Sequence, residues 1–408
     1  MNPSKSDRQH PSLFVGIDVS KLKHDIVILA EDKKPVAKLL VIKDDRAGYQ
    51  QLLSLLQTLA DQFQTKEFYI GLEATADYWK NVYFFLKKQA DTARLTVINP
   101  VQTRAFAKTE LRRAKTDPVN ARDIALFMAE KRPRPSVDRP RVFDNLKDID
   151  KRIYQINKQK TMLTNKLRLE LTKVAPEIEK ATRRIQGCQV LALLANYPTA
   201  EAIDNASITE LAQIKYGRRL WSLPLPFIEQ TKSLAQNSIA YKSGPGAGVV
   251  VRSVVHSILA AQKEIESLQQ QSLELYKTAR PEDSLLATIP GIRLHTAITL
   301  EAYIGDVHRF TRAKQFIAYF GMNPTVNQSG KSKRASYLQK KGNPIVRHKL
   351  FMAVLCMISC QKEPIYSYYN RMVAAGKPKL VAICAAMRKL LNIIFSMLKN
   401  QQPFNDQL

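Results

Sequence analysis

Cysteine is scarce in this chain of 408 residues. The four cysteines show neither the spacing of a disulfide framework nor a histidine at zinc-binding distance along the sequence. This pattern excludes a disulfide-stabilised fold and a structural zinc site of the usual kinds. We expect all four to be reduced residues of the core, and they are Cys188, Cys356, Cys360 and Cys384.

Targeting segments and long apolar runs are also missing. The first twelve residues are polar and contain no apolar signal core, and no run approaches the length of a membrane span. We therefore expect a cytoplasmic protein.

Acidic residues are few compared with basic ones. The chain has 36 aspartates and glutamates against 63 lysines and arginines, a formal net charge of +27. Such an excess favours a polyanionic partner, because every neutralised phosphate releases counterions. The excess is spread over many segments and is not confined to one tail, so we expect nucleic acid as the partner in preference to an inert basic surface. The length predicts two or three domains.

Strand-like runs alternate with amphipathic stretches in the first third of the chain, which predicts an α/β domain over residues 13–130. The apolar runs Leu13–Ser20 and Asp25–Leu29 are typical of a β-hairpin. Further on, Tyr49–Phe63 has helical spacing, whereas Glu67–Leu72 and Leu95–Ile98 are typical of buried strands. A basic, proline-rich linker is expected at residues 131–144.

The rest of the chain is predicted to be helical. Residues 145–284 contain two apolar series at three-four spacing, which indicate two long helices that pair with each other or with another protomer as a coiled coil. An insert at about 187–247 has no assignable function, and a mostly helical domain is expected at 285–400. The two series are Ile149, Ile153, Ile156, Leu163, Leu167 and Val174, and Val254, Ile258, Ala261, Ile265, Leu268 and Leu275.

Carboxylates stand at three places in the first domain where a metal site could form. Asp18 and Glu73 each end a predicted strand, where a charge needs a cation, a donor or a metal, unless it caps a turn. Asp117 precedes a proline as an N-cap would, and Asp117, Asn120 and Asp123 recur on roughly one helix face. Oxygen ligands that converge from several elements are what two-metal phosphoryl chemistry requires.

A serine beside a glycine lies in a long, polar, basic loop between Asn323 and Asn343. On the sequence alone Ser329-Gly330 is typical of a turn. The lysines and arginines that follow could stabilise an alkoxide and the phosphate that it attacks.

The motifs of the first domain resemble the RuvC-like (RNase H fold) domain of insertion-sequence transposases of the IS110 type, including the IS1111 subgroup, which are related to pilin-gene DNA invertases. The matching segments are Gly16–Lys21, Leu72–Thr75, and Lys115–Asp117 with Ala121, Ile124 and Ala125. The resemblance implies that Asp18, Glu73 and Asp117 are the first three members of an Asp-Glu-Asp-Asp tetrad. The fourth is Asn120, where the family usually has Asp, or Asp123 one helical turn later.

The last domain resembles the C-terminal domain of the same family. The matching motifs are Gly321–Pro324, Ser329-Gly330, Lys340–Asn343 and Arg347–Leu350. The resemblance implies that Ser329 is the catalytic serine, with Ser332 as a second candidate.

The resemblance implies a fold of the α/β plus α class, with a RuvC-like domain, a central coiled-coil region and a helical transposase domain. It also implies a nucleoid-associated bacterial DNA transposase or recombinase that works as a dimer or tetramer through a phosphoserine intermediate. Mg²⁺ or Mn²⁺ would bind Asp18, Glu73 and Asp117 with Asn120 or Asp123, and a structured noncoding RNA would guide the enzyme. No Walker-type glycine loop is present, in keeping with chemistry that conserves the phosphodiester bond energy. The expected nucleic-acid contacts are Lys115, Arg122, Lys331, Lys333, Arg334, Lys340, Lys341 and Arg347.

Two other functions stay open at this point. One is a junction-resolving nuclease that hydrolyses DNA with the first domain alone. The other is a noncatalytic nucleic-acid-binding protein whose metal site has decayed at Asn120.

Overall fold

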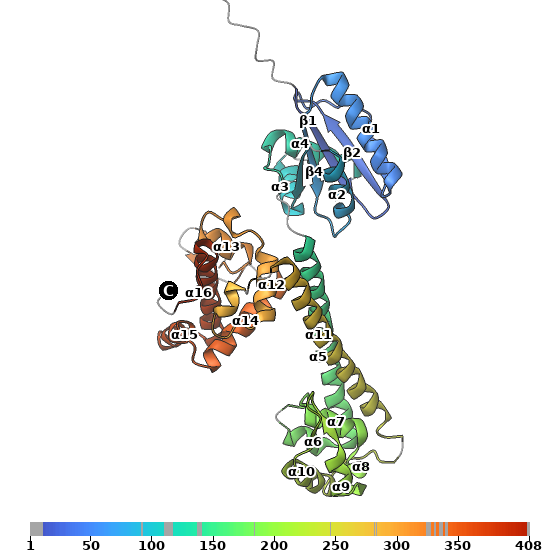
Figure 1. Cartoon of the computed structure of the whole chain (residues 1–408), viewed down its shortest axis with the longest axis vertical. Helices are drawn as coiled ribbons and strands as arrows, with labels where there is room; N and C mark the ends of the chain where they lie inside the picture. Colours follow the sequence, from blue (N-terminus) through green and yellow to red (C-terminus); the bar gives the residue numbers. More distant parts are fainter. Residues whose placement is uncertain are drawn as a thin grey trace, which may run out of the picture. The chain divides into compact units, whose positions relative to one another are not determined.

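The structure is a computed structural model with two compact units, whose boundary falls between residues 138 and 139. Figure 1 shows the elements of each unit. The structure describes residues 11–90, 93–109, 117–136, 141–182, 184–244, 246–280, 282, 284–323, 328–329, 332–333, 338 and 342–405.

A five-stranded sheet forms the centre of the first unit, with the strand order β3-β2-β1-β4-β5. The predicted hairpin is confirmed, because β1 pairs antiparallel with β2. β4 pairs parallel with β1, and β5 pairs parallel with β4. The strands are β1 (Leu13–Val19), β2 (Lys23–Leu29), β3 (Leu40–Lys43), β4 (Phe68–Glu73) and β5 (Ala93–Ile98).

Two helices cover each face of this sheet. Leu13, Val15 and Ile17 point to the face packed against α1 (Arg46–Phe63) and α2 (Trp79–Gln89). The opposite face packs against α3 (Pro100–Thr109) and α4 (Asp117–Lys131), as the cluster of Phe14, Tyr69, Phe106 and Ile124 shows. Because side chains alternate along a strand, the even-numbered residues of β1 lie under α4.

The approach of α4 to the sheet is unusually close. A Cβ atom at Gly16 would lie 2.0 Å from the carbonyl oxygen of Ala121, and one at Gly71 would lie 2.6 Å from Cγ of Met128. Only glycine permits this contact at either strand. The first turns of α4 are therefore held beside the last residues of β1, where Asp18 stands.

Two long helices form the centre of the second unit. α5 (Arg141–Val174) and α11 (Val249–Ala279) pack against each other, with Ile153 and Ile156 facing Ile265. The prediction of two paired helices is confirmed, and the pairing shown here is within one chain (Figure 1).

A helical insert joins α5 to α11 and packs on one end of the pair. Leu167 and Leu171 of α5 and Val255 of α11 share its core. Its elements are α6 (Pro176–Ala181), α7 (Cys188–Asn196), α8 (Ala200–Asn205), α9 (Ile208–Gln213), β6 (Lys215–Tyr216), β7 (Trp221–Ser222) and α10 (Leu225–Gln236).

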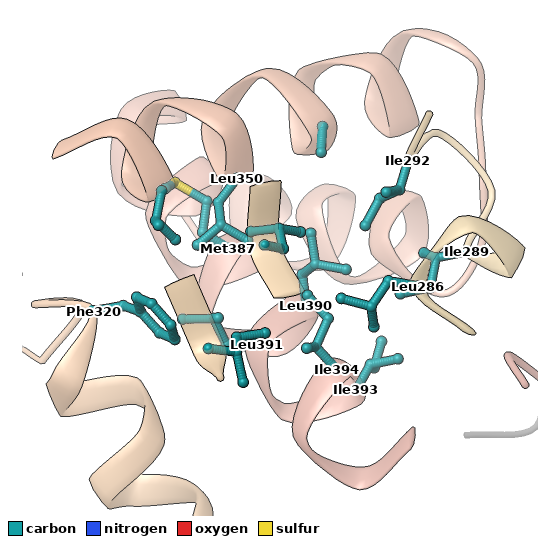
Figure 2. Packing of buried hydrophobic residues seen from close by; sticks show 14 of the residues in the cluster. Leu286, Ile289, Ile292, Phe320, Leu350, Met387, Leu390, Leu391, Ile393 and Ile394 are labelled. Atoms are coloured by element: carbon teal, nitrogen blue, oxygen red, sulfur yellow. The ribbon is translucent and has the colours of Figure 1, made fainter. Parts of the chain in front are cut away.

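The C-terminal part of the chain is mostly helical, as predicted, and contacts the other end of the helix pair through α12. Figure 2 shows its apolar core, in which Leu350, Leu390 and Leu391 pack together. Its elements are η1 (Leu285–Thr288), α12 (Leu294–Ile304), η2 (Val307–Arg309), α13 (Ala313–Tyr319), β8 (Gln328–Ser329), β9 (Ser332–Lys333), α14 (Pro344–Ser359), α15 (Ile365–Ala374) and α16 (Lys379–Asn400).

Two expectations from the sequence are wrong. The cysteines are not core residues, because Cys188, Cys356 and Cys360 are exposed and Cys384 is half-buried. One helix, α16, is long and apolar enough to cross a membrane. Leu390, Leu391 and other apolar side chains of α16 are buried in the C-terminal core, and a core helix passes the same test of length and composition.

Candidate active site

One row of the sheet carries three acidic residues on neighbouring strands. Asp18 on β1 lies directly opposite Asp25 on β2. Glu73 on β4 is one step beyond the register pair Ile17 and Leu72, which places it level with Asp18. All three side chains therefore point to the face covered by α3 and α4. Asp25, which is only 3% exposed, was not predicted from the sequence, although the register of the predicted hairpin would have placed it beside Asp18.

Two threonines hold the carboxylate of Glu73. The hydroxyl of Thr103 on α3 donates to Oε2 at 2.7 Å, and the hydroxyl of Thr75 donates to Oε1 at 3.3 Å. Thr103 is buried, so its hydrogen bond fixes the half-buried Glu73 side chain toward α3. No sequence motif singled out Thr103, because its role depends on how α3 folds back over the sheet.

Helix α4 brings its polar side chains to the same place. The amide Nδ2 of Asn120 donates a hydrogen bond to Oδ2 of Asp18 at 3.1 Å. Asp123, one turn further along α4, is 6% exposed. Asp117 is the first residue of α4, and its side chain lies outside the described part of the structure. Asn120 therefore contacts the site directly, and both Asn120 and Asp123 stay candidates for its fourth position.

The donors that meet here are oxygen atoms of carboxylates and amides, which are the ligands that Mg²⁺ and Mn²⁺ prefer. Among the residues whose side chains the structure describes, no three acidic, histidine or cysteine side chains lie close enough to hold a metal ion. Asp18 and Glu73 are level on adjacent strands and Asn120 touches Asp18, so the donor chemistry fits a hard divalent cation. The side chain of Asp117, the predicted third carboxylate, lies outside the described residues.

The predicted nucleophile lies in a small hairpin of the second unit. β8 and β9 pair so that Ser329 lies directly opposite Ser332, and Gln328 lies opposite Lys333. The two candidate serines are therefore register partners. The side chains of these residues lie outside the described structure, as do the predicted contacts Lys115, Lys331, Arg334, Lys340 and Lys341. Of the other predicted contacts, Arg122 is exposed on α4.

The segment between α13 and α14 contains Ser329, and its two ends are in contact. A Cβ atom at Gly342 would lie 2.1 Å from the carbonyl carbon of Phe320, so the backbone that leaves α13 touches the backbone that enters α14. Asn343 caps α14 by accepting from the amide of Ile345 at 2.8 Å. Arg347, a predicted nucleic-acid contact, donates to the carbonyl of Gly342, and burial lowers the pKa of its guanidinium. In this structure Arg347 therefore stabilises the place where the two ends of the segment between α13 and α14 meet.

A buried polar cluster lies where α5 meets α12 and α14. Asp150 of α5 is 2% exposed and accepts a hydrogen bond from Thr299 at 2.9 Å, while its Oδ2 has no partner among the described residues. Burial raises the pKa of Asp150 to about 6, against the opposing charge of Lys349. Burial, assisted by Lys349, lowers the pKa of His295 to about 4. This cluster ties α5 to the domain that carries the serine.

Two segments of the chain match known transposases. Residues 15–176 match the IS110-type DEDD transposase family, and residues 283–370 match the transposase family IS116/IS110/IS902. The pilin gene-inverting protein of Moraxella bovis is 24% identical over 397 residues, which are 97% of this chain and 98% of that protein. The IS110 43.6 kDa protein of Streptomyces coelicolor is 26% identical over 247 residues, 59% of each chain. The transposase of IS1111A from Coxiella burnetii is 24% identical over 137 residues, 33% of this chain and 38% of its own.

The two matched segments define the class of this protein, which is a DNA transposase or recombinase. They follow in the same order as the carboxylate-bearing unit and the serine-bearing domain. The chain belongs to the IS110 type of insertion-sequence transposases.

Proposed function

We propose that this transposase cuts and joins the DNA of an insertion sequence with a carboxylate site in the first unit and a serine nucleophile in the second. The observation that carries the proposal is the meeting of Asp18, Glu73 and Asn120 on one face of the sheet. The strand order β3-β2-β1-β4-β5, antiparallel from β3 to β1 and parallel from β1 to β5, supports a RuvC-like RNase H fold for this unit.

A divalent cation, Mg²⁺ or Mn²⁺, would be held by Asp18, Glu73 and Asp117 with Asn120 or Asp123. When bound, it supplies positive charge next to the scissile phosphate. The protein's own contribution is to fix the ligands before DNA arrives. Thr103 orients Glu73, and Asn120 restrains Asp18. Such preorganisation lowers the reorganisation that the reaction requires.

The serine step conserves the energy of the phosphodiester bond. The hydroxyl oxygen of Ser329 attacks phosphorus, a new serine–phosphate ester bond forms, and the bond from phosphorus to one deoxyribose oxygen breaks. The proton that leaves the serine ends on the deoxyribose oxygen that is released. A hydroxyl of another strand then attacks the phosphoserine and regenerates Ser329, so DNA is joined without nucleotide hydrolysis.

The partners follow from the charge and the relatives. A net charge of +27 suits contacts with DNA phosphates and equally with a structured noncoding guide RNA. The name of the Moraxella bovis relative describes inversion of a gene, which is DNA recombination. We propose a dimer or tetramer in which the carboxylates of one protomer act with Ser329 of another, in a cytoplasmic protein associated with the nucleoid.

The test is a trap for DNA bound covalently to the protein, run with Mg²⁺ on wild type, Ser329→Ala and Asp18→Ala. We expect a denaturation-resistant adduct with wild type and none with either variant. Cleavage of DNA by Ser329→Ala would instead indicate a nuclease that works by hydrolysis. Absence of any strand transfer by wild type with every metal would indicate a noncatalytic binding protein. Sequencing of RNA that copurifies with wild type tests the guide.

A further inference from the structure

The helical insert carries a small hairpin that neither matched transposase segment covers. The matches end at residue 176 and resume at residue 283, whereas β6 and β7 span Lys215–Ser222. Gly217 and Leu220 have positive φ angles of 69° and 50° and close the turn between the two strands. The hairpin is held next to its turn, where Gln189 donates to the hydroxyl of Tyr216, the register partner of Trp221, at 2.9 Å.

Two large apolar side chains of this hairpin face solvent. Trp221 is 56% exposed and Leu220 is 68% exposed. Trp221 is one of only two tryptophans in the chain. A side chain of this size is seldom exposed to solvent unless it belongs to a binding surface. The flat aromatic ring of Trp221 and the aliphatic side chain of Leu220 together expose apolar surface at the turn.

The charge of the hairpin has one sign. Its eight residues include Lys215, Arg218 and Arg219 and no aspartate or glutamate. Arg218 pairs with Glu266 of α11 at 2.8 Å, which steadies the turn against the helix pair. Arg219 is exposed and has no carboxylate partner among the residues that the structure describes. A second copy of the hairpin would bring the same positive charge, so symmetric self-association is disfavoured.

We propose that the β6–β7 hairpin binds an unpaired strand of nucleic acid, with a base stacked on Trp221 and phosphates beside Arg219. An aromatic ring flanked by arginines is the combination that binds single strands without reading sequence, because every base has a π-face and every nucleotide a phosphate. The assignment gives the insert a role in holding strands and does not depend on the chemistry of Ser329.

The fluorescence emission of Trp221 provides a direct signal for the binding of a strand to the hairpin. In full-length Trp79→Phe, Trp221 is the only tryptophan, so its emission follows this one site. Titration with fluorescein-labelled dT20 and U20 follows binding to the whole protein by anisotropy while the emission of Trp221 is recorded. We expect both strands to quench Trp221 and to protect it from acrylamide. Quenching by only one of them identifies the hairpin's strand as DNA or RNA.

Variants made in the Trp79→Phe background separate stacking from charge. Arg219→Ala is expected to shift the quenching curve to about fivefold higher strand concentration, and to reduce its salt dependence by about 0.7 in log Kd per log salt. Trp221→Ala in the full chain is expected to weaken single-strand binding about tenfold, whereas Trp221→Phe keeps it within about threefold. Tyr241→Ala, which removes another exposed aromatic of the insert, is the matched control and leaves quenching unchanged.

A protein saturated with either strand by anisotropy, yet with unchanged Trp221 emission and acrylamide access, overturns the proposal. So does a Trp221→Ala variant that changes the oligomeric state while single-strand binding keeps its wild-type Kd, because the hairpin would then contact protein.

Discussion

The side-chain amide of Asn120 donates to the carboxylate of Asp18 across 3.1 Å, and this contact links α4 to the strand that opens the fold. In a metal-bound site the amide would present its oxygen to the cation. Asn120→Asp should therefore lower the Mg²⁺ concentration for half-maximal DNA cleavage about tenfold, because a carboxylate binds the cation more strongly. Asn120→Ala should raise it by a similar factor. A Mg²⁺ titration of strand cleavage measures both changes.

The Mg²⁺ requirement of Asp123→Asn is compared with that of Asn120→Ala to decide which residue fills the fourth position of the site. If Asn120 fills the fourth position, Asp123→Asn alters the Mg²⁺ requirement less than Asn120→Ala does. Loss of cleavage in Asp123→Asn with an unchanged requirement in Asn120→Ala would assign the position to Asp123.

Asp25 and Asp18 face each other across β1 and β2, and like charges in that arrangement repel, while Asp25 also pairs with the exposed Lys23 at 3.5 Å. Asp25→Asn should stabilise the metal-free first unit by up to about 1 kcal/mol. It should also reduce the rise in melting temperature caused by Mg²⁺ or Mn²⁺, because less repulsion is left for a cation to relieve. Asp32→Asn, which removes an exposed carboxylate paired with Lys34, is the control and should change neither value. A clear destabilisation of metal-free Asp25→Asn would contradict the repulsion.

Gly16 sets the distance between α4 and the sheet. Gly16→Ala would place a methyl group 2.0 Å from the carbonyl oxygen of Ala121, so α4 must shift and the Asn120–Asp18 hydrogen bond must lengthen. We expect a loss of about 1–3 kcal/mol in the unfolding free energy of the first unit, together with loss of cleavage. Urea denaturation measures the first effect. Gly246→Ala, where no atom lies within 4 Å of the added Cβ, should leave stability unchanged.

The cluster of Asp150 and His295 predicts opposing pH effects. For Asp150, a folded pKa of about 6 above the ordinary 3.8 means that its contribution to stability is present below pH 4 and is lost as pH rises through 6. For His295, a folded pKa of about 4 below the ordinary 6.5 means that its contribution is present above pH 6.5 and is lost as pH falls through 4. Between pH 4 and 6 the two trends offset each other in wild type.

Single substitutions should expose each trend. From pH 4 to 6, the opening free energy of α12 should fall by about 3 kcal/mol in His295→Gln and rise by a similar amount in Asp150→Asn. Lys349 and Thr299, which both stabilise the charged form of Asp150, stay in place in both variants. Amide hydrogen exchange of α12, corrected for intrinsic rates at each pH, measures the slopes. Parallel slopes in the two variants would contradict the assignment.

Much of the first unit was predictable because its elements have clear periodicity. The hairpin of β1 and β2, the helix α1 and the strands β4 and β5 all lie within a few residues of the predicted ranges. Asp18 and Glu73 were selected as candidates because a carboxylate at the end of an apolar strand is unusual. Asp25 was missed because its importance comes from register, and Thr103 was missed because its contact with Glu73 depends on the path of α3.

The second unit was less predictable for a different physical reason. Helix α14 is apolar on nearly all sides, so its sequence does not show that Met352 and Cys356 face solvent while Leu350 and Met357 face the core. The long helices were predicted from spacing, but the choice between pairing within the chain and pairing between protomers needed the structure. The exposed Trp221 belongs to strands of two residues, which are too short to have a period.

The identity of the residue that carries DNA tests the central claim most directly. The covalent adduct formed with Mg²⁺ would be digested with nuclease and protease, and the nucleotide-bearing peptide sequenced by tandem mass spectrometry. A nucleotide on Ser329, absent in Ser329→Ala and in Asp18→Ala, is the predicted result. DNA cleaved by wild type without any adduct, or an adduct on Ser332, would contradict the assignment of Ser329 as the nucleophile.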